Sequence, residues 1–361
     1  MVSTCIWSPD LIVYPMKLIA FIIILSFAVP IAHAQKITLK VMQFNIWLEG
    51  TQVPNGFDAI VSEIINNDID VVTFNEVLNE KNVHFNDRIV KALKEKGKTY
   101  FSFYADDSGI VSKYPIILST SVYPEKVDTG SIYKAIIKVG EAKIAIYSSH
   151  LDYTHYACYL PRGYSGNTWK KIDKPVTNLD SILANTLSSK RFEEITTVIA
   201  DAEKEFKNGN SVIISGDFNE PSHLDWVKTN KNRCDHNGMI VPWPVSTLLA
   251  KTGYVDSYRQ IFPNPLTHPG FTYPADNPDA DISKLTWAPE ADERERIDFI
   301  YFKLKKAITL KKVAIIGPKG CIVKSKREEE HTHDNFILPA GIWPSDHKAV
   351  LATFEITNGK F

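Results

Sequence analysis

The stretch that decides the fold is residues 212–219, which read Val-Ile-Ile-Ser-Gly-Asp-Phe-Asn. Its apolar start predicts a buried strand, and the glycine and polar residues after it predict that the strand ends there. Side chains two residues apart on an extended segment point the same way, so Asp217 and Asn219 face one reacting group together. A carboxylate beside an amide donor suits water activation next to stabilisation of a charged oxygen. The alternative is a strand followed by an ordinary Asx-rich turn.

The composition is that of a soluble globular chain. Of the 361 residues, 44% are hydrophobic and 23% are charged, which allows a large core. The formal net charge is −1. Strong nonspecific binding to nucleic acid usually needs a clear basic excess, so the overall charge disfavours that class of partner. A local basic face stays open as an alternative.

The first 34 residues are predicted to be removed from the mature protein. A leader begins at Met16-Lys17, with an apolar run over 18–31 and then Ala-His-Ala at 32–34. Because this leader is better placed at Met16, residues 1–15 resemble an upstream start. This order is typical of a secretory signal peptide cleaved after Ala34, and the run is short for a membrane anchor. We expect a secreted or periplasmic protein, with no transmembrane span and a single domain over residues 35–361.

Three cysteines, Cys158, Cys234 and Cys321, remain after that cleavage. In an oxidising compartment an odd count allows one disulfide and one spare thiol. We expect Cys158 to pair with Cys234, because both fall in loop-like segments that flank the region around residues 212–219. The sequence has no metal-binding spacing such as Cys-x-x-Cys.

Strand-like and helix-like segments alternate without a convincing linker or repeat. Alternation and short apolar runs predict strands at 37–44, 71–74, 100–104, 116–123, 132–139, 143–149, 212–214, 297–302, 313–316 and 349–354. Helical spacing occurs at 57–65 and 195–206. Many strands with fewer helices predict two sheets packed face to face with helices outside. Two long aperiodic segments, 151–180 and 220–290, are predicted to be functional loops.

Polar residues cluster where the predicted strands end, which is where open sheets place ligands. They are Asn45, Glu76, His150, Asp298 and the pair Asp346-His347. Taken singly, each has a structural explanation: a strand cap, a helix start, a core histidine or a partner for a neighbouring arginine. Together they indicate one shared site that also includes Asp217 and Asn219.

On these residues the sequence resembles the endonuclease/exonuclease/phosphatase superfamily, the fold of deoxyribonuclease I, inositol polyphosphate 5-phosphatases and neutral sphingomyelinases. The resemblance spans about residues 37–356 and is carried, in the family's order, by Gln43-Phe44-Asn45, Asn75-Glu76, Ser112-Lys113-Tyr114-Pro115, Ser149-His150-Leu151, Gly216-Asp217-Phe218-Asn219, Arg296-Ile297-Asp298 and Ser345-Asp346-His347. The family commonly has glutamine where this chain has Asn75, which changes a neighbour of the metal-binding glutamate and not the ligand. The resemblance implies an α/β fold, a four-layer α/β/β/α sandwich, and Mg²⁺-dependent cleavage of a phosphate ester by one catalytic domain.

The residue types fit such chemistry. Mg²⁺ prefers hard oxygen ligands and keeps several waters, so Glu76, Asn45 and Asp346 suit a sparse metal site, with Mn²⁺ or Ca²⁺ as alternative ions. A bound cation offsets charge on the phosphoryl oxygens. His347 and Asp217 are the two candidates for accepting the proton of the attacking water, and the sequence does not choose between them.

The other polar residues have supporting roles in this hypothesis. Asp298 would hold the ring of His347 in the productive tautomer. Asn219 would donate to a phosphate oxygen, and His150 would donate to another oxygen or protonate the leaving group.

The long segments mix aromatic and basic residues, which can stack on a substrate ring while binding phosphate. The candidate substrate-binding residues there are Tyr153, Arg162 and Trp226; the resemblance adds Thr272, where relatives often have a Thr-Tyr motif, and Lys113 is a further candidate for positioning phosphate. The alternatives are that the aromatics pack the loops against the body of the protein and that Lys113 is a solvated turn residue.

We therefore expect a secreted, monomeric, metal-dependent phosphodiesterase that acts on a small-molecule phosphoester or a lipid headgroup. A nonspecific, deoxyribonuclease-like endonuclease is the second hypothesis, and nucleic acid is the less favoured substrate. A phosphoinositide or sugar-phosphate phosphatase comes third, and an inactive binding module on the same fold comes last.

Overall fold

The computed structural model describes residues 1–6, 10, 35–79, 83–123 and 130–358. Residues 34–361 group into one compact unit and residues 1–33 into another. The predicted signal peptide falls almost entirely outside the described residues, so it stays a prediction. Within the described ranges, no helix is both long and apolar enough to cross a bilayer.

The first sheet has seven strands in the order β14-β11-β15-β1-β2-β4-β3. Their bounds are β1 Gln35–Asn45, β2 Val71–Val77, β3 Phe101–Ser102, β4 Asp107–Ser112, β11 Ile308–Ile316, β14 Phe336–Ile337 and β15 Ala349–Asn358. β2 is covered on both faces, which explains its nearly continuous apolar start. β1 and β2 are parallel with Asn45 level with Asn75, so both strands deliver polar residues to the same end of the sheet.

The second sheet has six strands in the order β5-β6-β7-β8-β10-β9. Their bounds are β5 Ile116–Tyr123, β6 Gly130–Val139, β7 Ala142–Leu151, β8 Ser211–Asp217, β9 Val255–Asp256 and β10 Asp298–Lys303. β7 runs parallel to β8 with His150 level with Asp217, and β10 runs antiparallel to β8 with Asp298 level with Asp217. Three predicted site residues therefore lie side by side on neighbouring strands.

The two sheets pack face to face around an apolar core. Residues of both sheets contribute to it, among them Val41, Val71, Ile146, Ile213 and Ile300. Hydrogen bonds also cross between the sheets near the ends of β2 and β8. The hydroxyl oxygens of Thr73 and Ser215 are 2.9 Å apart, and the hydroxyl of Ser148 donates to the carbonyl of Phe74 at 2.9 Å. The sheets thus meet through an apolar interior and polar contacts beside the residues at the strand ends.

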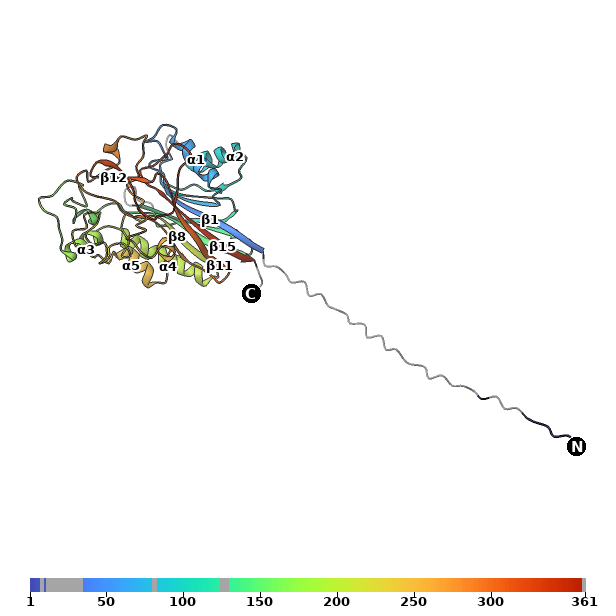
Figure 1. The fold of residues 1–361 in the computed structure, drawn as a ribbon. Coiled ribbons are helices and arrows are strands. Elements are labelled where there is room, and N and C mark those ends of the chain that lie inside the picture. Colours follow the sequence, from blue (N-terminus) through green and yellow to red (C-terminus); the bar gives the residue numbers. More distant parts are fainter. Residues whose placement is uncertain (7–9, 11–34, 80–82, 124–129, 359–361) are drawn as a thin grey trace. The chain divides into compact units, whose positions relative to one another are not determined.

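Helices cover the outer faces of both sheets. α1 (Gly56–Asn66) and α2 (Phe85–Glu95) pack on the first sheet, and α4 (Arg191–Lys207) and α5 (Pro244–Lys251) pack on the second. Figure 1 shows the strands between these two helical layers. The apolar stripe of α4 that the sequence predicted, with Ile195 and Val198, lies against Tyr147 and Ile214. The predicted four-layer α/β/β/α sandwich is confirmed.

The two long segments contain more structure than the sequence predicted. They include the 3₁₀ turns η2 (Ala157–Tyr159) and η3 (Ile282–Lys284) and the helices α3 (Leu179–Leu187), α5 and α6 (Ser257–Ile261), and the hairpin β12 (Gly320–Val323) and β13 (Lys326–Glu329) follows them. A separate buried cluster joins them through Tyr156, Tyr159, Trp226, Trp243 and Tyr273. Many of their aromatics therefore pack the segments against the body, as the alternative interpretation held.

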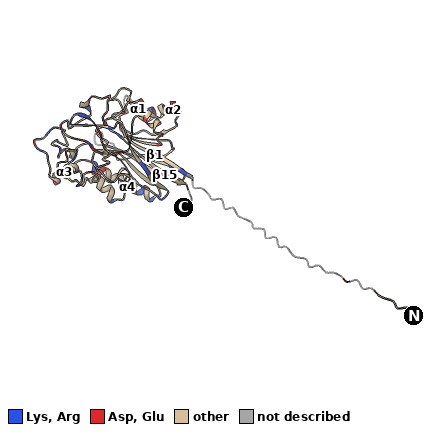
Figure 2. Ribbon diagram, in the orientation of Figure 1, with Lys and Arg blue, Asp and Glu red and all other residues tan. Residues whose placement is uncertain are grey.

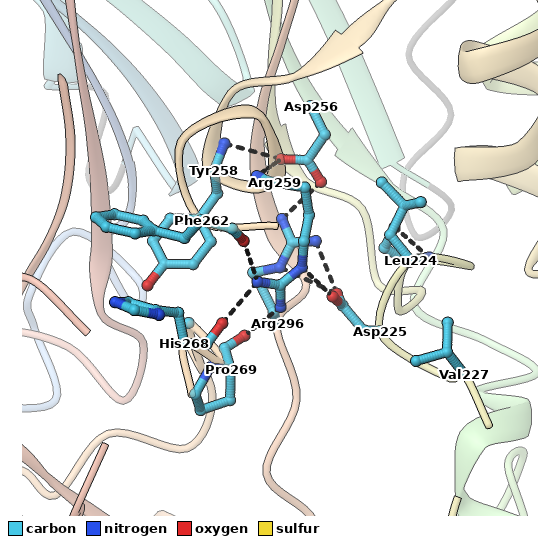
Figure 3. A network of polar contacts seen from close by, with 12 residues as sticks. Leu224, Asp225, Val227, Asp256, Tyr258, Arg259, Phe262, His268, Pro269 and Arg296 are labelled. Carbon is cyan, nitrogen blue, oxygen red and sulfur yellow. Dashed lines mark hydrogen bonds and ion pairs between the residues drawn. The ribbon is translucent and has the colours of Figure 1, made fainter. Parts of the chain in front are cut away.

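A buried ion network ties the segment after β8 to the approach to β10 (Figure 3). The guanidinium of Arg296 pairs with Asp225 and with Asp256, each at 2.8 Å. Arg259 donates to Asp225 at 2.7 Å and to the carbonyls of His268 and Pro269 at 2.6 and 2.9 Å. Because Arg296 lies two residues before Asp298, this network anchors the start of the strand that carries Asp298.

The expected Cys158–Cys234 disulfide is wrong. Both cysteines are free and buried, and so is Cys321. The guanidinium of Arg162 bridges the two segments instead, donating to the carbonyl of Cys158 and to the carbonyl of Cys234, each at 3.1 Å. Hydrogen bonding to one arginine therefore joins these loops where the sequence suggested a covalent link.

Candidate active site

The polar ends of both sheets line one cavity of about 460 Å³. Six of the predicted catalytic and metal-binding residues line it: Glu76, His150, Asp217, Asn219, Asp346 and His347. The rest of the lining is aromatic or aliphatic, namely Trp47, Leu48, Tyr153, Tyr156, Tyr159, Trp169, Tyr273, Trp287 and Ile297. Over the described part of the chain, no lysine or arginine lines this cavity. The lining therefore combines three carboxylates and two histidines with many aromatic side chains.

His347 is held between two carboxylates. Its Nδ1 lies 2.9 Å from Oδ2 of Asp298, and its Nε2 lies 3.7 Å from Oδ2 of Asp217. Burial opposes ionisation of the ring, but Asp298 and Asp217 outweigh it and raise the pKa of His347 well above its ordinary value. Asp298 thus occupies one ring nitrogen and leaves the other facing Asp217 and the cavity.

Asp217 is set in place by its own strand and by Asn75. Its backbone N–H donates to the side-chain oxygen of Asn75 at 2.8 Å, and one carboxylate oxygen accepts the N–H of Asn219 at 2.9 Å. Gly216 has φ +155°, and a Cβ there would lie 1.7 Å from the carbonyl oxygen of Ser149, so only glycine allows β8 to pass β7 here. Burial, helped by repulsion from Asp298, raises the pKa of Asp217 to about 6.

Glu76 sits at a bulge in β2. The pairing with β4 shifts register between Asn75 and Val77, and Glu76 has φ 65°, a left-handed conformation that is uncommon for this residue type. Bulges re-aim side chains, and this one leaves Glu76 lining the cavity. One carboxylate oxygen accepts the N–H of Leu48 at 3.0 Å.

Asn45 lies at the predicted place but acts as a donor. Its amide nitrogen donates to Glu76 at 3.0 Å and to Asp217 at 3.1 Å. Its oxygen accepts the backbone N–H of Trp47 at 3.0 Å, and because that N–H can only donate, the orientation of the amide follows. Asn45 thus holds two carboxylates together, and its oxygen keeps a second lone pair, so its role as a metal ligand stays a prediction.

The carboxylate of Asp346 has the properties expected of a metal ligand. It is buried, and within the described ranges its Oδ1 has no hydrogen-bond partner. Burial is the main reason that the pKa of Asp346 rises to about 7, and repulsion from Glu76 and Asp217 adds to it against the effect of His347. Buried acidic oxygens that repel one another are satisfied by a hard cation. The donor set therefore fits a divalent metal held by Glu76 and Asp346.

A second group of ligand atoms lies next to these residues. Asp217, Asp298 and His347 each bring one potential ligand atom, and these atoms lie within 4.8 Å of one another. Nδ1 of His347 and Oδ2 of Asp298 already contact each other, so a metal between them would displace that contact. We therefore regard Glu76 and Asp346 as the stronger candidates for metal ligands.

His150 is paired with an aspartate that the sequence did not single out. Its Nδ1 lies 2.9 and 3.0 Å from the two carboxylate oxygens of Asp107. Burial opposes the charge, but Asp107 outweighs it and raises the pKa of His150 to about 10. The one sequence signal was an acidic pair at 106–107, which is too common to stand out.

Asn219 also lines the cavity, with φ 46°. Its side-chain amide donates to the carbonyl of Leu151 at 2.9 Å, which engages one of its two amide hydrogens. The second hydrogen is the one that suits the predicted contact with a phosphate oxygen.

Ser345 links two segments that carry site residues. Its hydroxyl donates to the carbonyl of Asn45 at 2.8 Å and accepts the backbone N–H of His347 at 3.0 Å. The serine of the Ser-Asp-His motif therefore ties the end of β1 to the turn that carries Asp346 and His347.

Four of the five candidate substrate residues do not line the cavity. Lys113 follows the end of β4 that pairs with Val71, so it lies at the opposite end of the sheet, where it binds Asp68 and Asp70 at 2.7 and 3.0 Å. Thr272 is buried, and its hydroxyl accepts the backbone N–H groups of Ile297 and Asp298, each at 3.2 Å. The structure thus places Lys113 away from the site and Thr272 in its supporting framework.

Arg162 and Trp226 belong to a buried cluster around Glu295. The carboxylate of Glu295 pairs with Arg162 at 2.7 Å and accepts the indole N–H of Trp226 at 3.1 Å. Trp226 also stacks on His236, with ring centroids 3.7 Å apart. The prediction that Arg162 and Trp226 contact the substrate is therefore wrong, because both side chains are buried and their polar atoms bind Glu295. Of the five candidates, only Tyr153 lines the cavity.

Comparisons with known proteins bring one family match and a relative of similar length. A model of the Endonuclease/Exonuclease/phosphatase family matches residues 42–347. An uncharacterized protein of Caenorhabditis elegans is 28% identical over 327 residues, covering 88% of this chain and 91% of that protein.

Two solved structures illustrate the fold-level similarity. D. rerio TDP2 complexed with single-strand DNA product is 17% identical, with a TM-score of 0.49, 88% of this chain covered and 98% of that chain covered. The human Nocturnin catalytic domain with bound sulfate is 13% identical, with a TM-score of 0.48 and coverages of 90% and 98%. At these scores neither structure indicates what this chain acts on.

Proposed function

We propose, from the premise that this chain belongs to the endonuclease/exonuclease/phosphatase family, that it is a divalent-metal-dependent phosphodiesterase acting on a small or lipid-linked phosphoester. Hydrolysis of a phosphate ester is the chemistry of the family. The observation that carries the finer proposal is the cavity, whose 460 Å³ falls within the roughly 300–1,000 Å³ of small-molecule sites. Its lining includes the predicted catalytic residues His150, Asp217, Asn219 and His347 together with many aromatic side chains.

The residues around His347 supply the proton transfer in this proposal. Asp298 fixes the ring so that Nε2 faces Asp217, and the pair Asp217 and His347 takes the proton of the attacking water. Asn45 donates to Asp217 and Glu76, which keeps the two carboxylates together despite their repulsion.

Two further groups contact the phosphate in this proposal. The imidazolium of His150, oriented by Asp107, donates to a phosphoryl oxygen or to the leaving oxygen, and Asn219 donates its second amide hydrogen. Glu76 and Asp346 would hold the metal ion, with Mg²⁺ as the proposed ion. When bound, a divalent cation would neutralise part of the charge on the phosphoryl oxygens.

The charge distribution favours this proposal over a nonspecific nuclease. Among the described residues the cavity is lined by neither lysine nor arginine, although proteins that bind nucleic acid track its backbone with such residues. Figure 2 shows basic and acidic residues interspersed along the ribbon.

The proposal extends to a secreted or periplasmic location, which rests on the leader over residues 16–34. Sequencing the N-terminus of the exported protein tests it, and a start at Gln35 is expected.

The test of the activity compares substrates with and without EDTA. Purified protein is incubated with bis-p-nitrophenyl phosphate, sphingomyelin, inositol phosphates and plasmid DNA in Mg²⁺. We expect turnover of the small diester or the lipid, loss of turnover in EDTA, and a loss of at least 100-fold in Asp217→Asn. Lys113→Ala is the matched control and should keep full activity, because Lys113 lies at the far end of the sheet. EDTA-insensitive turnover, or DNA cleavage at rates rivalling the diesters, would contradict the proposal.

A further inference from the structure

Three aromatic side chains, Tyr153, Trp169 and Trp287, form a continuous wall of the cavity. We call them the aromatic wall. The ring centroids of Tyr153 and Trp169 are 5.9 Å apart with an interplanar angle of 17°, and those of Trp169 and Trp287 are 5.8 Å apart. All three line the cavity that holds Asp217 and His347.

Trp169 packs partly against the buried cluster of the loops, but such packing does not account for the other two residues of the aromatic wall. Tyr153 is 44% exposed and Trp287 is 57% exposed, whereas the nearby Tyr156 and Tyr159 are buried and already fill the interior of these loops. Large exposed aromatics that adjoin one another at a cavity mark a binding surface more often than a packing requirement. The wall is thus available to a ligand.

The wall is also held in place before any ligand binds. The backbone N–H of Trp169 donates to the carbonyl of Ser165 at 3.0 Å within a short turn. The backbone N–H of Trp287 donates to Glu293 at 3.2 Å, and the hydroxyl of Tyr159 donates to the same buried carboxylate. A preorganised wall loses little entropy when a flat group stacks on it.

Charge limits what can lie between the wall and the catalytic residues. Glu76, Asp217 and Asp346 line the cavity, and the two histidines are the only basic side chains of the described lining. Lys171, which follows the wall residue Trp169 in sequence, is paired with Glu290. The cations of the cavity, His150, His347 and the proposed metal ion, serve the phosphate at the reacting centre, and the described lining holds no lysine or arginine for a second phosphate.

We infer that the substrate carries a single phosphodiester group and an organic group without negative charge, which stacks on the aromatic wall. This inference rests on the proposed phosphodiesterase function and adds the class of substrate. Aromatic faces attract both planar neutral rings and cationic ammonium groups, so a nucleoside or a quaternary ammonium group supplies the same chemistry.

The test uses diesters that share one leaving group, p-nitrophenol. The reference is methyl p-nitrophenyl phosphate, which has nothing to reach the wall. The arms are p-nitrophenyl phosphorylcholine and the p-nitrophenyl ester of thymidine 5′-phosphate, and the comparator is that thymidine ester with an added 3′-phosphate. We expect kcat/KM for at least one arm to exceed the reference about 10-fold, because a group stacked on the wall stabilises the bound ester. The 3′-phosphate should lower kcat/KM about 10-fold or more.

Variants separate the wall from the catalytic residues. Trp169→Ala and Trp287→Ala should bring the ratio of arm to reference close to 1, with a smaller change on the reference ester. Phe192→Ala, which removes an exposed aromatic of α4 outside the cavity, is the control and should leave every ratio unchanged. Ratios that survive loss of the wall, or a rate raised by the 3′-phosphate, overturn the inference and leave the phosphodiesterase proposal standing. Failure to hydrolyse any ester overturns both.

Discussion

The imidazole of His347 and the carboxylate of Asp298 form a buried pair, with Nδ1 2.9 Å from Oδ2. Asp298 begins β10, and His347 comes from the turn before β15, so the pair joins a strand of the second sheet to a loop of the first. Thr272 and the ion network around Arg296 both fix the start of β10. The geometry of the pair therefore depends on buried polar contacts outside the cavity.

Replacing Asp298 with asparagine should lower kcat by roughly 10²–10⁴-fold, because an amide in place of a carboxylate lets the His347 ring adopt the wrong tautomer. Steady-state kinetics on bis-p-nitrophenyl phosphate measures the loss. In the double variant with His347→Ala, the two losses should not add, since both residues act as one unit. Additive losses, or activity within a few-fold of the parent, would contradict the assigned pairing.

Arg296→Met should destabilise the fold by about 3–5 kcal/mol, because it takes the ion-pair partner from the buried carboxylate of Asp256 and leaves Asp225 with Arg259 alone. Urea unfolding measures the change. The matched control is Lys311→Met, which removes an exposed ion pair with Glu355 and should change stability by about 0–1 kcal/mol. Equal effects of the two substitutions would show that the network in Figure 3 does not anchor β10.

Glu194 should make stability fall as the pH rises. Burial is the main cause that raises the pKa of Glu194 from its ordinary value near 4.5 to about 8. Between these values the folded protein keeps a proton that the unfolded chain has lost, so stability decreases from about pH 4.5 to about pH 8. Glu194→Gln removes this titration. The difference in unfolding free energy between parent and variant, measured across that range, should slope accordingly, and a flat difference would contradict the assignment.

Asp107→Asn should lower the pKa of His150 from about 10 toward its ordinary value, because it removes the carboxylate that stabilises the imidazolium. Below about pH 6 the ring should stay protonated in both proteins, and the two should differ at neutral and higher pH. NMR titration of the His150 ring measures this, with the remaining histidines as internal controls. A His150 that titrates unchanged would show that Asp107 does not set its charge.

Much of the candidate site is predictable because its information is local. The strand ends at Asn45, Glu76, His150 and Asp217 follow from apolar runs that stop at polar residues, and the structure brings all four to one end of the two sheets. The bulge that re-aims Glu76 depends on its pairing with β4, and no local pattern announces it.

The substrate side illustrates what local patterns leave undecided. Arg162 and Trp226 are residue types that commonly bind phosphate and stack on rings. Both are instead buried and bind Glu295, which lies more than 60 positions away along the chain. Trp287, by contrast, is exposed at the cavity. The same types therefore serve as core or as binding surface according to contacts that only the folded chain makes.

The sequence by itself determined the family, most of the long strands with the helices α1 and α4, and the chemical types at the strand ends, because periodicity and residue type are properties of neighbouring positions. Only the tertiary structure decided which aromatic and basic residues face the cavity and which amide oxygens are already engaged. It also decided that Asp107 pairs with His150 and that Asn45 donates to two carboxylates. Those outcomes depend on burial and on partners distant along the chain, and a side chain acquires them only when the sheets pack.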